Sequence, residues 1–273
     1  MIGRRLLPPE YHAWNRKWGS PFGRGVAQRR VRPKTAPYRI RRRATKLARF
    51  YFPPLVGPFG FQKNNDTRLF EYPWAFLATP LHAGMRAVEL GGSLSGFQFV
   101  LSKCGVKVTN VDPGDEAAIG WPVSQEMIGR LNRFFRTDVE LVSSRLEESG
   151  LEEASFDRVV SISTIEHIPR EELPAVLSAV KRLLKPGGML VLTVDLFLDL
   201  YPFTKAESNR LGHNISISDI VLWSGLDLVQ GNRQELYGFE EFDAKEVLRK
   251  LPEYLYGSGY PSLAQALVLQ KKV

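Results

Sequence analysis

The stretch Val88-Glu-Leu-Gly-Gly-Ser-Leu-Ser-Gly96 has the pattern of a strand that passes through a loop of small residues into a helix. Small side chains in such a loop let a ligand approach the backbone closely. The free N–H groups at the start of the helix that follows can hold a carboxylate or a phosphate. The stretch therefore predicts a ligand-binding loop between a first strand and a first helix.

The next predicted strand, residues 107–111, ends at Asp112, which lies 21 residues after Gly91. An acid at the tip of the second strand can accept both hydroxyls of a ribose, as in dinucleotide-binding folds. A glycine loop alone is a weak signal, but loop, helix and acid at this spacing together are a stronger one. The simpler alternative is that Asp112 only caps the turn through Pro113 and Gly114.

Strand and helix periodicities alternate along the rest of the chain. We predict strands at residues 86–90, 107–111, 139–142, 156–162, 189–194, 226–230 and 264–270. We predict helices at residues 64–79, 97–104, 123–135, 173–184 and 217–223. This alternation predicts a Rossmann-like α/β fold, with a doubly wound, mostly parallel seven-stranded sheet.

The composition is that of an ordinary globular protein, with 44% hydrophobic and 24% charged residues in a chain of 273. A single cysteine, Cys104, excludes a disulfide framework within the chain. No stretch reaches about 20 apolar residues, so we expect no membrane span. The N-terminus has no apolar core of a secretory signal, and we expect a cytoplasmic protein.

Positive charge is concentrated at the N-terminus. Residues 1–63 hold 16 Lys/Arg and one acid, a net charge of +15, whereas residues 64–273 carry a net charge of −7. We therefore divide the chain into a basic, aromatic-containing extension (1–63) and a globular domain (64–273). Such an arm suggests nucleic acid, an anionic membrane surface or an acidic partner, or else a solvated extension. Because the predicted sheet starts near residue 86, we expect the domain to fold without residues 1–45.

Five segments, taken in order, resemble the class I S-adenosylmethionine-dependent methyltransferases. They are Val88–Gly96, Val108–Asp112, Ser155–Val160, Ser161–Ile168 and Arg182–Leu192. Any one of these segments is common, but five in this order and with family-like spacing are specific. The resemblance implies an enzyme, with S-adenosyl-L-methionine as its cofactor.

The resemblance also implies roles for individual residues. Glu89 stands where the family has an acid near the methionine amino group, and Asp112 would bind the ribose hydroxyls. The other cofactor-binding candidates are Gly91, Gly92, Ser93 and Gly96 in the loop, Ser144 and Arg145 beside the adenine, and Ser161 at the tip of the fourth strand.

Two departures from the family pattern concern the cofactor. The family loop has glycine where this chain has Ser93 and Ser95. The family often places an acid beside the adenine amino group, where this chain has Ser144 or Arg145. The adenine would then be held by backbone groups or by weaker bonds.

His167 and Glu166 are the catalytic candidates, because they follow the fourth strand, where the family places the transferable methyl group. Methyl transfer requires an aligned acceptor and, for a hydroxyl or an ammonium, a group that takes a proton. A histidine suits that role near neutral pH, although His167 is as readily a structural histidine. Asp195 and His213 are the alternatives. We predict no metal site, because three scattered ligands such as Glu166, His167 and Asp195 are weak evidence for one.

The leading functional hypothesis is methyl transfer to an oxygen or nitrogen of a small molecule, such as a sugar or secondary metabolite. Two insertions, at about residues 196–215 and 233–262, are long enough to cap an acceptor pocket. One alternative is methylation of RNA or a ribosomal component, anchored by the basic arm. Another is a non-catalytic cofactor-binding protein on the same scaffold, which the two departures would explain.

Overall fold

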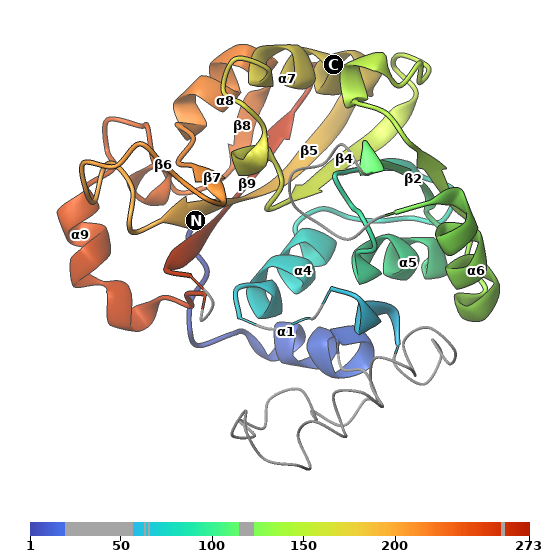
Figure 1. Cartoon of the computed structure of the whole chain (residues 1–273), viewed down its shortest axis with the longest axis horizontal. Coiled ribbons are helices and arrows are strands. Elements are labelled where there is room, and N and C mark those ends of the chain that lie inside the picture. The colour runs from blue at the N-terminus through green and yellow to red at the C-terminus, as the bar shows by residue number, and fades with distance from the viewer. Residues whose placement is uncertain (20–56, 63, 65, 115–122, 258–259) are drawn as a thin grey trace.

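The structure is a computed structural model that describes residues 1–19, 57–62, 64, 66–114, 123–257 and 260–273. In these ranges a seven-stranded sheet with the order β3-β2-β1-β4-β5-β9-β8 occupies the centre of the molecule (Figure 1). Its strands are β1 (Arg86–Leu90), β2 (Lys107–Val111), β3 (Val139–Val142), β4 (Phe156–Ile162), β5 (Leu184–Phe197), β8 (Asp227–Gln230) and β9 (Ser262–Gln270). A two-stranded hairpin, β6 (Ser208–Asn209) with β7 (Gly212–His213), lies outside this sheet.

Strands β1 to β5 run parallel to one another, and β9 pairs antiparallel with both β5 and β8. The prediction of a mostly parallel, doubly wound, Rossmann-like sheet is therefore confirmed. The chain proceeds from β1 outward to β3 and then returns to β4 on the other side of β1. The order of the strands thus reverses between β1 and β4, and a ligand site is expected there at the carboxyl ends of the strands.

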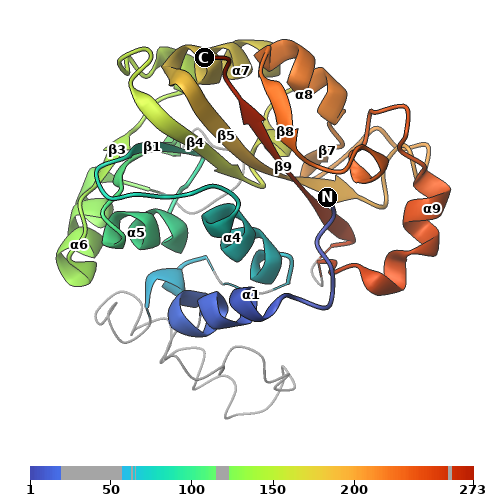
Figure 2. The ribbon, with the colours of Figure 1, turned by 180° about the vertical axis from the view of Figure 1, so that it is seen from behind.

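Helices cover both faces of the sheet (Figures 1 and 2). One face carries α4 (Arg68–Leu77), α5 (Gly96–Lys103) and α6 (Gln125–Phe135), and the other carries α7 (Leu173–Leu183) and α8 (Ile217–Ser224). Two further short helices, α1 (Pro9–Trp14) and α9 (Ala244–Arg249), lie outside these layers. Burial on both faces explains why the strands are nearly continuous apolar runs. None of the helices in the described ranges is long and apolar enough to cross a membrane.

The first nineteen residues pack against the body of the protein. Ile2 forms an antiparallel bridge with Gln265 of β9, and the backbone N of Gly3 donates to the oxygen of Ala264 at 3.0 Å. Farther along, Trp14 is 5% exposed and contacts the rings of Tyr72 and Phe97. Residues 1–19 therefore contribute to the core, and the expectation that residues 1–45 are dispensable for folding needs revision. The boundary at residue 63 stays a prediction, and the densest part of the basic arm lies outside the described residues.

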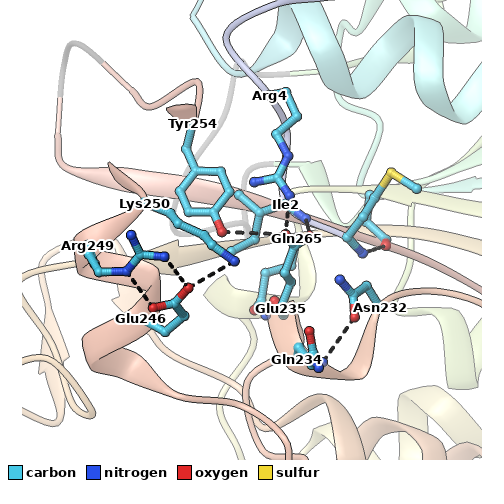
Figure 3. Close-up of polar contacts among 12 residues, drawn as sticks. Ile2, Arg4, Asn232, Gln234, Glu235, Glu246, Arg249, Lys250, Tyr254 and Gln265 are labelled. Atoms are coloured by element: carbon cyan, nitrogen blue, oxygen red, sulfur yellow. Dashed lines mark hydrogen bonds and ion pairs between the residues drawn. The ribbon is translucent and has the colours of Figure 1, made fainter. Parts of the chain in front are cut away.

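Glu235 fastens residues 1–5, which we call the N-terminal strap (Figure 3). Its carboxylate is nearly buried and accepts hydrogen bonds from the backbone N of Ile2 at 2.9 Å and from the guanidinium of Arg4. The Tyr254 hydroxyl donates to the same carboxylate at 3.4 Å, and its ring lies 4.6 Å below the Arg4 guanidinium. One acid thus connects the start of the chain to the insertion at residues 233–262.

Candidate active site

A cavity of about 450 Å³ opens at the carboxyl ends of β1, β2 and β4, where the order of the strands reverses. Helix α4 and the turn that follows β3 contribute to its wall. Eight of the eleven predicted site residues line this cavity: Glu89, Gly91, Gly92, Ser93, Asp112, Ser144, Arg145 and His167. The parallel sheet therefore brings segments that are far apart in sequence to one place.

The loop after β1 has the backbone conformation that the small residues suggested. Gly91 has φ +66°, and a Cβ atom added there would lie 2.2 Å from Cγ2 of Thr164. Ser93 also adopts a left-handed φ of +46°, which explains why glycine is the usual residue at that position. Ser95 accepts a hydrogen bond from the backbone N of Phe97 at 3.0 Å, and so caps the N-terminus of α5. Both serines therefore fit a closed loop.

Two buried amide side chains hold this loop, and sequence reasoning missed both. Asn110 accepts a hydrogen bond from the backbone N of Gly92 at 3.2 Å and donates to the oxygen of Ser93 at 2.9 Å. Gln98 donates to the oxygens of Ser93 and Ser95 at 3.0 and 2.9 Å. These hydrogen bonds to the backbone restrict the conformation of the loop.

Asp112 supports the loop as well as facing the cavity. One carboxylate oxygen accepts a hydrogen bond from the backbone N of Ser93, and the other accepts one from the backbone N of Gly114, both at 2.8 Å. The turn-capping alternative is therefore part of the structure. Each carboxylate oxygen has a second lone pair, so these bonds leave room for two ligand hydroxyls.

Glu89 and Arg68 face the cavity beside this loop. The Oε2 atom of Glu89 is buried and has no hydrogen-bond partner among the described residues. Burial raises the pKa of Glu89 to about 8, against the opposing effects of the Ser95 hydroxyl and of Arg68. Arg68 bonds to Glu71 at 3.2 Å, and its side chain is 24% exposed. A carboxyl and a guanidinium on the wall of one cavity can hold an ammonium and a carboxylate of one ligand.

The other end of the cavity is lined by Ser144, Arg145 and Glu147. The Ser144 hydroxyl donates to the oxygen of Arg145, and Arg145 pairs with Glu172 at 2.7 Å. Glu147 was not a candidate, yet its Oε2 atom is buried and has no partner in the described part of the chain. An acid, Glu147, therefore faces this end of the cavity. It lies two residues after Arg145, where the family often has an acid beside the adenine and this chain has none.

His167 lies in a short turn after β4, at residues 165–167, and lines the cavity. Its Nδ1 atom bonds to the carbonyl oxygen of Leu211. A carbonyl can only accept, so Nδ1 carries the hydrogen and the neutral ring has its lone pair on Nε2. Burial lowers the pKa of His167, which keeps the ring neutral at pH 7. His167 thus has the protonation state of a group that can take a proton.

Three predicted residues, Glu166, Ser161 and Gly96, do not line the cavity. Glu166 is fully buried and accepts the backbone N of Asp195 at 2.9 Å, and burial raises its pKa. Ser161 is fully buried within β4. A Cβ atom on Gly96 would lie 2.7 Å from Phe59, so this glycine permits close packing. Their predicted roles at the cofactor or the acceptor gain no support from the geometry.

Neither Asp195 nor His213, the alternatives to His167, lines the cavity. Across the described residues, no group of three or more His, Cys, Asp and Glu side chains is arranged to hold a metal ion.

Comparisons with known proteins match part of the chain to a family. Residues 89–192 match the methyltransferase-domain family, and no curated protein sequence matches the chain significantly. An S-adenosylmethionine-dependent methyltransferase from Mesorhizobium loti is 17% identical with a TM-score of 0.50, over 74% of this chain and 97% of that one. A methyltransferase from Bacillus halodurans is 13% identical with a TM-score of 0.51, over 74% and 99% of the two chains. At such identities these structures show a shared fold.

The matched residues 89–192 include the loop after β1, Asp112 and the turn that holds His167. They also contain the segments of β1, β4 and β5 on which the resemblance rested. The carboxyl oxygen of Glu89 that has no partner among the described residues fits a ligand with an ammonium group. Residues 89–192 therefore form a methyltransferase domain, and the chain has the fold of S-adenosylmethionine-dependent methyltransferases.

Proposed function

We propose that this enzyme transfers a methyl group to an oxygen or nitrogen of a small molecule, such as a sugar or secondary metabolite. The observation that carries this proposal is the cavity of about 450 Å³, which has His167 on its wall. Leu211 and Tyr260, one from each of the predicted insertions, also line it. A cavity of this size suits small ligands.

The residues around the cavity fit the cofactor from end to end. S-adenosylmethionine, when bound, supplies an electrophilic methyl group on a sulfonium. We assign its ammonium to Glu89, its carboxylate to Arg68 and its ribose hydroxyls to Asp112. We assign the adenine amino group to Glu147. Support comes from the buried carboxyl oxygens of Glu89 and Glu147, which have no partner among the described residues.

His167 is the proposed general base. Its neutral ring and the lone pair on Nε2 suit it to take a proton from the acceptor, while the bond to Leu211 fixes the ring. We expect His167→Ala to lower turnover by about 10²–10⁴-fold, the usual contribution of a positioned base. Affinity for S-adenosylhomocysteine, measured by calorimetry, should change little. Near-normal turnover in this variant across the pH range would remove the assignment.

The acceptor class can be tested with S-adenosylmethionine that carries a labelled methyl group. The enzyme would be incubated with a metabolite extract and, separately, with total RNA from the same cells. We expect label in the small-molecule fraction. Label only in RNA would favour the RNA alternative, whose basic arm lies largely outside the described residues. Cofactor binding without label in either fraction would favour the non-catalytic alternative.

A further inference from the structure

Two hydroxyl groups on the cavity wall direct their hydrogens away from the cavity. Ser163 donates to a carboxyl oxygen of Glu71, and Tyr260 donates to Oδ2 of Asp195 at 3.1 Å. A hydroxyl has one hydrogen and two lone pairs, so each group has only lone pairs left for a ligand. The other oxygen of Asp195, Oδ1, is buried without a partner among the described residues. When Asp195 is protonated, its hydrogen can therefore lie on Oδ1, and Oδ2 can still accept the hydrogen bond from Tyr260.

Two more lining groups also use their hydrogen on a protein partner, although these partners, Gln62 and Leu211, line the cavity themselves. The Tyr72 hydroxyl donates to Oε1 of Gln62 at 3.2 Å, and His167 donates its Nδ1 hydrogen to the oxygen of Leu211. The ring of His167 therefore offers the lone pair of Nε2. With Ser163 and Tyr260, these groups form a wall that accepts hydrogen bonds, which we call the acceptor wall.

Three buried acids lie behind the acceptor wall. Glu71, Glu166 and Asp195 are 0%, 0% and 2% exposed, and each has a carboxyl oxygen without a partner in the described ranges. The guanidinium of Arg68 bonds to one of them, Glu71. Burial raises the pKa values of Glu166 and Asp195, because the charged forms are poorly solvated there. A ligand group with several hydrogens would be stabilised at this wall, because the lining groups offer it lone pairs.

We infer that the methyl acceptor is an amine and that the methyl group goes to its nitrogen. This inference rests on the proposed function and narrows it. An ammonium has two or three N–H donors for the lone pairs of Ser163, Tyr260, Tyr72 and His167, whereas a hydroxyl has one. A buried polar wall that is left unpaired is costly, so the group with more donors is selected.

The reaction balances with the groups present. Nε2 of His167 takes one proton from the ammonium, which leaves a neutral amine with a free lone pair. The nitrogen then forms a bond to the methyl carbon as the carbon–sulfur bond breaks, and the electron pair of that bond stays on sulfur. The product is a methylated ammonium together with the neutral thioether, and the proton on His167 later passes to solvent.

Sinefungin tests the wall without a known acceptor, because a carbon replaces the sulfur of the cofactor and an amine replaces its methyl group. We expect calorimetry to show that sinefungin binds at least about tenfold more tightly than S-adenosylhomocysteine. Tyr260→Phe should reduce that preference and leave the affinity for S-adenosylhomocysteine nearly unchanged. Tyr256→Phe is the matched control, because Tyr256 is 46% exposed in the same insertion and does not line the cavity. Equal affinities for the two ligands in the wild-type protein would overturn the inference.

The position of the new bond gives a second test. Incubation of the enzyme with S-adenosylmethionine carrying a ¹³C methyl group and a metabolite extract labels the product, and N-methyl and O-methyl carbons resonate in separate regions of a carbon NMR spectrum. We expect the label in the N-methyl region. Label in the O-methyl region would overturn this inference and leave the proposed function intact. Failure to bind S-adenosylhomocysteine would instead contradict the proposed function.

Discussion

Replacing Glu235 by glutamine should detach the N-terminal strap from β9. The carboxylate accepts hydrogen bonds from three donors, namely the backbone N of Ile2, the Arg4 guanidinium and the Tyr254 hydroxyl. Glutamine has one oxygen and one NH₂ group, so its NH₂ group would face at least one of the three groups that donate to Glu235. The backbone N of Ile2 is buried and cannot turn to water, and Glu235 itself is 6% exposed.

The size of the effect follows from these contacts. A hydrogen bond to a charged group contributes about 1.5–3 kcal/mol, and a buried donor left unpaired costs about 1–3 kcal/mol. Since glutamine keeps one acceptor, we expect the free energy of unfolding to fall by about 2–4 kcal/mol. For a protein of this size, that corresponds to a loss of roughly 5–12 °C in Tm. Thermal and urea denaturation would measure it, and hydrogen exchange at the Ile2 amide would show whether the strap opens first.

Glu246→Gln is the matched control, and both acids are drawn in Figure 3. Glu246 pairs with Arg249 and Lys250, but its side chain is 42% exposed, and exposed pairs contribute little to stability. We expect its Tm to stay within about 2 °C of the wild type. If Glu235→Gln behaves like this control, the strap is not fastened as the hydrogen bonds suggest.

Three further predictions concern the cofactor. Gly91→Ala should lower the affinity for S-adenosylhomocysteine at least about tenfold, because its Cβ atom would lie 2.2 Å from Thr164; unchanged calorimetry would contradict this geometry. Burial raises the pKa of Glu89 to about 8, so the acid is protonated below that pH and binds an ammonium better as pH rises. Affinity should therefore increase from about pH 6 to pH 8, and Glu89→Gln should flatten that dependence. Arg68→Met should weaken binding of S-adenosylhomocysteine by about 10–100-fold but spare 5′-methylthioadenosine, which has no carboxylate; equal losses for both ligands would refute the assignment.

The parts of the fold that follow local periodicity were predictable from sequence. Strand β4 has the predicted bounds, and α7 and β9 agree within two residues. The reason is that a buried parallel strand or an amphipathic helix leaves its own pattern in the chain. The cofactor loop was found for the same reason, because its small residues stand between such elements.

Contacts between segments that are far apart in sequence leave no such local pattern. Arg68 faces the cavity because α4 packs against β4 and β5, and nothing in its neighbours signals this. Tyr260 lies in an insertion, and Glu147 is displaced by two residues from the position where an acid was sought. Glu166 shows the opposite limit, because adjacency to His167 in sequence did not place it on the cavity wall.

The strap also constrains the order in which the protein can be completed during synthesis. Ile2 bonds to Glu235, which lies 233 positions later, and it pairs with Gln265 of the last strand. At translation rates of about 5–20 residues per second, the strap waits roughly 10–50 seconds before its first partner leaves the ribosome. Docking of the strap can therefore take place only after nearly the whole sheet has been made. Until Glu235 and Gln265 have both been made, Ile2 has neither of these partners.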